Sequence, residues 1–246
     1  MTTFICNTFH NPWVLCDCLK TLDAYAPAPA VVVSHEASQD ERRIIEHVCD
    51  YIEIPTKILW LDDVQPPTGF NEAVKHVDTE YVGLFNDDVM FIPHSPVWEV
   101  LEEAMTPDVG MAGCATNFSA TAENILRTDL PDVSDVLFLT GATQIMRTDD
   151  YIDMGGYDPT FDAIGGYWDI DLCIRVLQSG KRIVLDKRAY YHHCGSTTIV
   201  QTPNRTLRGE LAINNLVRKH GLGVCEDFLS YAYHDPTYHS MKEAVA

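Results

Sequence analysis

The chain has 246 residues, and its 17 Lys and Arg side chains against 36 Asp and Glu give a formal net charge of −19. A hydrophobic content of 46% is ordinary for a folded domain, so this charge does not indicate disorder. A chain this acidic excludes broad, sequence-independent DNA binding, which depends on Lys and Arg contacts to phosphates, and leaves open only a small local nucleic-acid site.

Short β-rich runs alternate with helix-period segments through the first ninety residues. Pro12 suits the first position of a helix that follows Asn11, and Ser38 is a typical N-cap for the next helix. The pattern predicts strands at 3–6, 30–33, 57–61 and 81–85 and helices at 13–25, 39–48 and 70–76. This alternation is typical of an α/β fold, a parallel sheet covered on both faces by helices.

The second half of the chain is less regular. We expect helices at 97–104, 149–154, 170–178 and 205–220, strands at 110–115, 137–147, 182–185 and 190–193, and a long polar loop at 117–133. No repeat, low-complexity tract or composition break marks a linker. We therefore expect one domain over residues 1–246.

Sequence features also indicate where the chain works. No stretch approaches the roughly 20 apolar residues of a membrane-spanning helix, and residues 1–7 lack the features of a secretory signal. We expect a cytoplasmic protein, soluble or peripheral to a membrane. Its eight cysteines, none in CxxC spacing, are then expected to be thiols rather than disulfides or zinc ligands.

Three polar residues, Asn86, Asp87 and Asp88, follow the predicted strand at 81–85. Ligands of open parallel sheets bind outside the carboxyl ends of the strands. Adjacent carboxylates at such an edge suit Mg²⁺ or Mn²⁺, which commonly link a protein carboxylate to substrate phosphates. Taken alone, the three residues favour a solvated turn, and the metal-site interpretation depends on the other motifs.

Two acids begin the predicted helix at 170–178. Asp171 has Arg175 one turn later, and we expect an exposed pair worth about 0.3–0.5 kcal/mol. Asp169 has no such local partner and follows a glycine-rich aromatic loop, so it is the better candidate for a general base. Further on, His192 and His193 alternate faces if their strand is regular, so only one of them can face a given site.

Taken in order, these motifs resemble those of GT-A glycosyltransferases, and in particular the inverting family 2 that includes rhamnosyltransferase-like enzymes. The family's "NxGfxxarNxGl…gdyvlfLNDDv" resembles residues 69–89, and its "tGaxxlirrxxfxxvGGfDexf…eDvDLclRlxxaGyxi" resembles residues 140–183. Its opening strand and helix resemble residues 3–22, "vyHhgg" resembles 191–195, and "n…f.rKwG" resembles 215–221. The resemblance covers nearly the whole chain and implies a GT-A fold, a Rossmann-like, mostly parallel sheet flanked by helices.

The resemblance also implies roles for particular residues. Asp88 and His192 would hold a Mn²⁺ or Mg²⁺ ion on the diphosphate of a UDP-, dTDP- or GDP-sugar, and Asp169 would deprotonate the acceptor hydroxyl. Residues 1–90 would bind the nucleotide, 91–204 would form the acceptor and catalytic half, and 205–246 would form a C-terminal helix and tail. The remaining implied positions are Ser34, Glu36, Asn71, Asn86, Asp87 and Gly141 around the donor, and Tyr167 and Trp168 on the acceptor side.

The sequence departs from the family at three of these positions. The acid that usually ends the second strand is missing, so Ser34 or Glu36 must substitute. Asn86 replaces the first acid of the metal motif, and Trp168 stands where a Glu often precedes the base. Acceptors left open are a glycan, a lipid-linked glycan, a protein or a modified DNA base. Alternative functions are a non-catalytic glycan- or nucleotide-sugar-binding relative and a sugar-phosphate nucleotidyltransferase.

Basic residues concentrate in one part of this acidic chain. Residues 181–220 contain eight Lys and Arg against one Asp and one Glu, a local charge of 8 − 2 = +6. A few solvated basic faces would explain this bias. The segment also brackets His192, so it would attract a diphosphate or a polyanionic acceptor if its charges are free.

Overall fold

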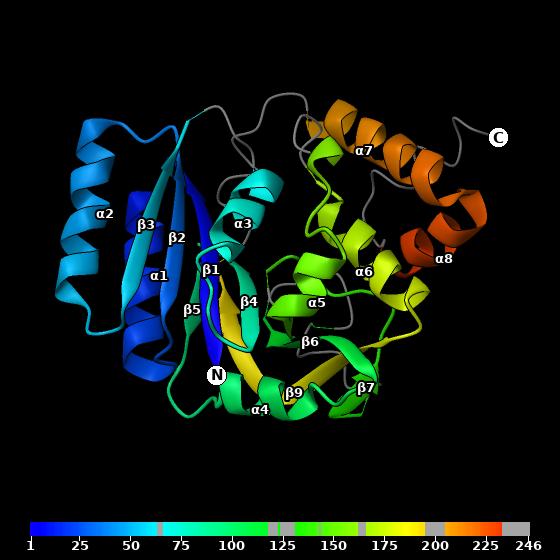
Figure 1. Ribbon diagram of the computed structural model, residues 1–246, viewed down its shortest axis with the longest axis horizontal. Helices are drawn as coiled ribbons and strands as arrows, with labels where there is room; N and C mark the ends of the chain where they lie inside the picture. The colour runs from blue at the N-terminus through cyan, green and yellow to red at the C-terminus, as the bar shows by residue number, and fades with distance from the viewer. Residues whose placement is uncertain are drawn as a thin grey trace.

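A single mixed sheet runs through the computed structural model, with helices on both faces (Figure 1). The structure describes residues 1–62, 66–117, 123, 131–142, 144–161, 166–194 and 205–232. Among these residues the strand order is β3-β2-β1-β4-β8-β6-β9-β5, with β7 paired to β9. No helix in the described part of the chain is long and apolar enough to cross a membrane.

The first half forms the parallel part of the sheet. Its elements are β1 (Thr2–Phe9), α1 (Pro12–Tyr25), β2 (Ala30–His35), α2 (Gln39–Tyr51), β3 (Thr56–Leu61), α3 (Pro66–Val74) and β4 (Tyr81–Asn86). The predicted alternation is confirmed in this half, with most elements a few residues longer. Pro12 occupies the start of α1, and Ser38 caps α2 through a capping box with Glu41.

The second half adds antiparallel strands and the remaining helices. Its elements are β5 (Val89–Phe91), α4 (Val97–Ala104), β6 (Val109–Thr116), β7 (Val133–Asp135), β8 (Gln144–Arg147), α5 (Thr148–Asp153), the 3₁₀ turn η1 (Pro159–Phe161), α6 (Trp168–Gln178), β9 (Arg182–His193), α7 (Arg205–His220) and α8 (Leu222–Ala232). In this half β6 and β9 pair in parallel, whereas β8, β5 and β7 run antiparallel to their neighbours.

Several of the predicted elements differ from the structure, among them the helix predicted at 70–76, which lies at 66–74 as α3. The strand predicted at 137–147 occupies only 144–147, because the chain before it forms the loop that leads to the sheet edge. The two strands predicted at 182–185 and 190–193 are one strand, β9, which is interrupted by a register shift against β6 after Asp186. Helix α8 was not predicted, and most of the loop predicted at 117–133 lies outside the described residues.

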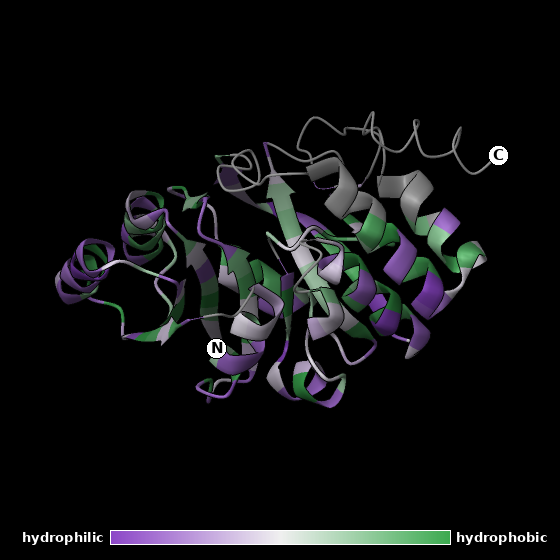
Figure 2. Ribbon diagram, turned by 90° about the horizontal axis from the view of Figure 1, so that it is seen from above, coloured by the Kyte–Doolittle hydropathy of each residue, from purple (hydrophilic) through white to green (hydrophobic). Residues whose placement is uncertain are grey.

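Two hydrophobic layers hold the helices on the sheet. Helices α1, α2 and α4 pack on one face through residues such as Leu19, Ile45 and Leu101. Helices α3, α5, α6, α7 and α8 contribute to the layer on the other face. Figure 2 shows the outermost helix, α2, to be mostly hydrophilic, in keeping with its exposed position at the edge of the molecule. All eight cysteines are free in the structure, and six of them are buried.

The predicted Asp171–Arg175 pair exists, but it is buried rather than exposed. Asp171 is fully buried, and its carboxylate lies 2.9 Å from the Arg175 guanidinium. At the end of α7, Lys219 Nζ and His220 Nε2 each lie 2.7 Å from the same carboxylate. Lys219 and His220 are distant from Asp171 in the sequence and reach it only through the tertiary fold, so the i, i+4 spacing around Asp171 could not predict these contacts. Asp171 therefore joins α6 to the last turn of α7.

Candidate active site at the carboxyl edge of the sheet

The sheet topology brings the predicted site residues to one edge. β1 and β4 run in parallel, with Asn7 beside Asn86, so the Asn86–Asp88 turn follows the carboxyl end of β4. β8 is antiparallel to β4, with Gln144 opposite Leu84, which places the residues before Gln144 at the same edge. β9 also ends there, because its last residues pair with β5 directly after Asp88. Open α/β sheets bind their ligands at this edge.

Asp88 is buried beside a histidine. His193 Nε2 lies 3.1 Å from Asp88 Oδ1, and the Cys194 N–H donates to the Asp88 carbonyl at 2.9 Å. Asn117 holds the histidine in place, since its side chain accepts from the His193 N–H at 2.7 Å and donates to the His193 carbonyl at 3.1 Å. His192 is exposed, so the structure brings His193, and not the predicted His192, to Asp88. Strand alternation separated the two histidines but did not reveal which one faces the site.

Asp87 lies in a different environment from its neighbour. Its side chain is buried, and desolvation raises its pKa to about 7, with the Thr8 side chain opposing this rise and the Asp88 charge adding to it. Its Oδ2 atom accepts no hydrogen bond from the described part of the chain. A buried carboxylate oxygen that accepts no hydrogen bond from the described residues, next to the Asp88–His193 pair, is consistent with a cation-binding site at this edge of the sheet.

Donor chemistry at this edge fits a divalent ion. Asp88 offers a carboxylate oxygen and His193 an imidazole nitrogen, ligands that Mn²⁺ accepts together. The described residues contain no group of three or more His, Cys, Asp or Glu side chains that could hold a metal ion. An ion bound here would therefore need further ligands, and phosphate oxygens and waters are usual ones for Mg²⁺ and Mn²⁺.

Asp169 stands in the first turn of α6 and contacts the loop before β8. Its Oδ2 accepts from the Gly141 N–H at 3.0 Å, and its Oδ1 accepts from the Ile170 N–H at 2.9 Å. Burial raises the pKa of Asp169, and these backbone hydrogen bonds oppose the rise because they favour the charged form. Tyr167 and Trp168 directly precede it in the sequence and are partly buried, and the backbone of Tyr167 is left-handed at φ 68°.

The other predicted donor residues divide into buried and accessible ones. Ser34 is buried in β2, whereas Glu36 is exposed just beyond its end. Asn86 is half-buried at the end of β4. Asn71 is engaged elsewhere: its Oδ1 accepts from the Tyr151 hydroxyl and the Tyr157 N–H, and its Nδ2 donates to the Tyr157 carbonyl at 2.7 Å. Asn71 thus fixes the turn at Gly156, which gives it a structural task.

Ion pairs engage four of the eight basic residues of the segment at 181–220. Lys181 pairs with Asp150, Arg188 with Asp186 and Glu103, and Lys219 with Asp158 and Asp171. Arg182 bridges Asp108 and Asp135. These four cations, Lys181, Arg182, Arg188 and Lys219, form ion pairs within the chain. For them the structure favours ordinary paired surface residues over a free basic patch that attracts an anion.

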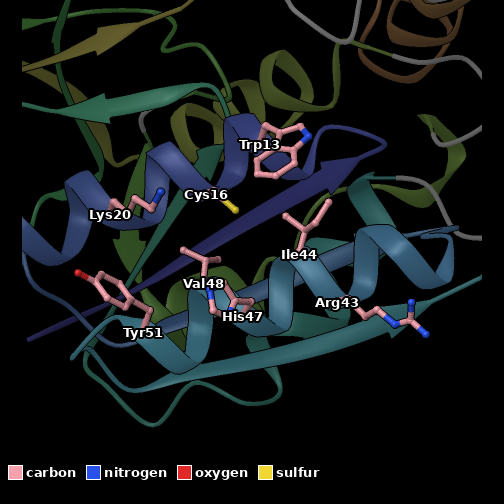
Figure 3. Close-up of a pocket in the computed structure, with 8 residues that line it drawn as sticks. All are labelled: Trp13, Cys16, Lys20, Arg43, Ile44, His47, Val48 and Tyr51. Atoms are coloured by element: carbon pink, nitrogen blue, oxygen red, sulfur yellow. The ribbon is translucent and has the colours of Figure 1, made fainter.

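The described residues also form a cavity that none of the predicted site residues lines. It is a groove of about 700 Å³ between α1 and α2, with Trp13 and Tyr51 exposed at its rim (Figure 3). Its lining residues are Trp13, Cys16, Lys20, Arg43, Ile44, His47, Val48 and Tyr51. Its lining includes His47 and Cys16 but no carboxylate, so it does not offer the acids that the sheet edge brings together, and the sheet edge remains the candidate site.

Comparison with solved structures identifies the architecture. GalNAc-T7 in complex with UDP, GalNAc and Mn²⁺ aligns at a TM-score of 0.67 and 8% identity over 78% of this chain and 43% of its own. The mannosyltransferase PcManGT of Pyrobaculum calidifontis, in complex with GDP-Man and Mn²⁺, aligns at 0.66 and 14% identity over 88% of this chain and 64% of its own. The chain has a GT-A fold. The predicted fold is thereby confirmed.

A third neighbour agrees with this assignment. TarS of S. aureus aligns at a TM-score of 0.59 and 14% identity over 88% of this chain and 39% of its own. The chain thus spans about two fifths to two thirds of the length of these GT-A neighbours. No protein-family profile and no curated protein matches the sequence.

Proposed function

We propose that the chain is a metal-dependent, inverting glycosyltransferase of the family 2 type. It would move a sugar from a nucleotide-sugar donor to the hydroxyl of a saccharide or another acceptor. The observation that carries this proposal is the pair of acids at one edge of a GT-A sheet, Asp88 beside His193 and Asp169 beside Gly141. Two GT-A neighbours in complex with UDP or GDP-Man and with Mn²⁺ support it.

In this proposal Asp169 is the general base. Its two oxygens each accept one backbone hydrogen bond, which orients the carboxylate and leaves lone pairs for the acceptor O–H. The acceptor oxygen forms its bond to the anomeric carbon as the bond from that carbon to the diphosphate oxygen breaks, and the proton passes to Asp169. A single displacement of this kind inverts the anomeric carbon.

Asp88 and His193 would hold the divalent ion, with Asn117 fixing the His193 backbone. When bound, the ion supplies positive charge that offsets the charge on the departing nucleoside diphosphate. The exposed Glu36, at the end of β2, is the better placed of the two candidates to contact the nucleotide, because the Ser34 side chain is buried.

The test measures transfer from a panel of UDP-, GDP- and dTDP-sugars by mass spectrometry, with Mn²⁺, with Mg²⁺ or with EDTA. We expect Asp169→Asn to lower the rate about 10²-fold to 10⁴-fold while donor binding, measured by thermal shift, is kept. Asp88→Asn should abolish stabilisation by Mn²⁺. Asp149→Asn, which changes an exposed acid on α5, is the matched control and should change neither the transfer rate nor the stabilisation by donor or Mn²⁺.

Two results would count against this proposal. Transfer that survives Asp169→Asn unchanged would remove Asp169 as the base. Binding of donor and Mn²⁺ by the wild type without turnover for any donor would favour the non-catalytic alternative.

A further inference from the structure

Glu123 is a fully buried acid for which the proposed reaction has no direct use. Its carboxylate oxygens lie 3.0 and 3.1 Å from the Thr140 N–H, and Oε1 lies 3.0 Å from the Thr140 hydroxyl. Its backbone carbonyl accepts from the Thr116 N–H at the end of β6, at 2.8 Å. Burying a carboxylate is costly unless hydrogen bonds compensate it, so this contact fixes Glu123 and Thr140 together.

Thr140 directly precedes Gly141, whose N–H donates to Asp169 Oδ2 at 3.0 Å. The Thr140 carbonyl and the Gly141 N–H belong to one planar peptide unit, so fixing Thr140 restricts the direction of the N–H. The sheet does not do this at residue 140, because β8 begins only at Gln144. A continuous chain of contacts therefore runs from Glu123 through Thr140 and Gly141 to Asp169.

We propose that Glu123 is a positioning residue for Asp169. By gripping the backbone and side chain of Thr140, it aims the Gly141 N–H at Asp169 Oδ2 and sets the orientation and proton affinity of the base. This inference rests on the proposed function for its catalytic meaning, while its structural part can be measured without turnover.

The surroundings of Asp169 make its titration a clean reporter. On α6, Cys173 and Arg175 lie nearby, and Tyr157 approaches from the turn before η1. Burial raises the pKa of both the Cys173 thiol and the Tyr157 hydroxyl, which keeps the two groups neutral as Asp169 titrates. Arg175 is the same in wild type and variant, and only Glu123 is changed in the test. Because loss of the Glu123 charge alone would lower the pKa of Asp169, an upward shift of its midpoint reports the weakened Gly141 hydrogen bond.

Glu123→Gln is the informative variant, because glutamine keeps the size of the side chain and one acceptor for Thr140. We expect kcat to fall about 10-fold to 100-fold, the loss expected when a hydrogen bond to a charged group weakens, with the donor KM changed less than about twofold. The acid limb of the pH–rate profile should move upward by up to about one unit, since the weakened bond favoured the charged form. In an Asp169→Asn background, Glu123→Gln should have no further effect on the residual rate.

Thr148→Val is the control for general loss of stability. It removes a buried hydroxyl that donates to the Thr79 carbonyl at 2.8 Å, away from this chain of contacts. It should lower the melting temperature without moving the pH profile. A Glu123→Gln variant with the wild-type profile, or one that slows the Asp169→Asn background by the same factor as the wild type, would overturn the positioning role.

A second measurement keeps the inference testable if the chain transfers no sugar. The carboxyl ¹³C signal of Asp169, assigned by its absence in Asp169→Asn, is followed against pH in the wild type and in Glu123→Gln. An upward shift of the midpoint in Glu123→Gln supports the positioning role even where the proposed function fails. An unchanged or lower midpoint overturns it, since loss of the Glu123 charge alone would lower the midpoint.

Discussion

Asp171 offers the sharpest test of how the second half of the fold is held together. Its buried carboxylate contacts Arg175 at 2.9 Å and both Lys219 and His220 at 2.7 Å. Asp171→Asn keeps the shape of the side chain but leaves these groups beside a neutral amide. Removing one partner of a buried ion pair costs about 3–5 kcal/mol. Lys219 is one-third exposed and has Asp158 as a second partner, so we expect about 3 kcal/mol.

Urea unfolding followed by circular dichroism measures this loss, and thermal unfolding should show a drop of about 6–12 °C for a domain of this size. The control is Asp40→Asn, which breaks an ion pair with Arg43 whose side chains are 88% and 74% exposed. That variant should change the free energy of unfolding by less than about 0.5 kcal/mol. A loss below about 1 kcal/mol for Asp171→Asn would place its pair among weak surface pairs and refute the argument from burial.

Two further predictions concern Asp87 and the Gly156 turn. Because the pKa of Asp87 is raised to about 7 from 3.8, the folded state holds the proton more tightly than the unfolded chain, so stability is lost as pH rises between these values. Without added metal, the free energy of unfolding of the wild type should fall by about 2–3 kcal/mol more between pH 5 and pH 8 than that of Asp87→Asn. An equal fall in variant and wild type would contradict this. Gly156→Ala should destabilise the chain by about 2–4 kcal/mol in urea unfolding, since Gly156 has φ +65° and an added Cβ would overlap Asn71 Oδ1. Gly155 has φ +82° and open space around it, so Gly155→Ala should cost about 1 kcal/mol. Equal losses for the two glycines would show that the Asn71 contact does not matter.

The sequence predicted the parallel half of the fold well because its information is local there. Each strand from β1 to β4 is a short apolar run, and each helix between them carries its own periodicity, with breaks at residues such as Pro27 and Pro29. The alternation then determines a parallel sheet with little dependence on distant contacts. The same reasoning was less accurate in the second half, where β9 continues through a register shift after Asp186 and looked like two strands.

The missed site residues depend on contacts between distant parts of the chain. Asn117 and His193 are 76 positions apart, and Asp88 and His193 are 105 apart. Strand alternation predicts that only one of the two histidines faces the site. Which of His192 and His193 does so depends on how β5 pairs with β9. Glu123 offered no signal of its own, because a single acid in a polar stretch is ordinarily solvated. Only its burial against Thr140 distinguishes it.

Two acids of α6, separated by one residue, show why residue type alone does not assign a catalytic role. Asp171 is fully buried and its oxygens contact Arg175, Lys219 and His220, so a substrate hydroxyl has no open approach to it. The hydrogen bonds that the structure gives Asp169 come from the Gly141 and Ile170 backbone N–H groups, and burial raises its pKa. A general base needs an oriented carboxylate whose charge is not already neutralised by a cation. The environments of these two acids therefore favour Asp169 as the base independently of the resemblance, whereas the contacts of Asp171 hold α6 against α7.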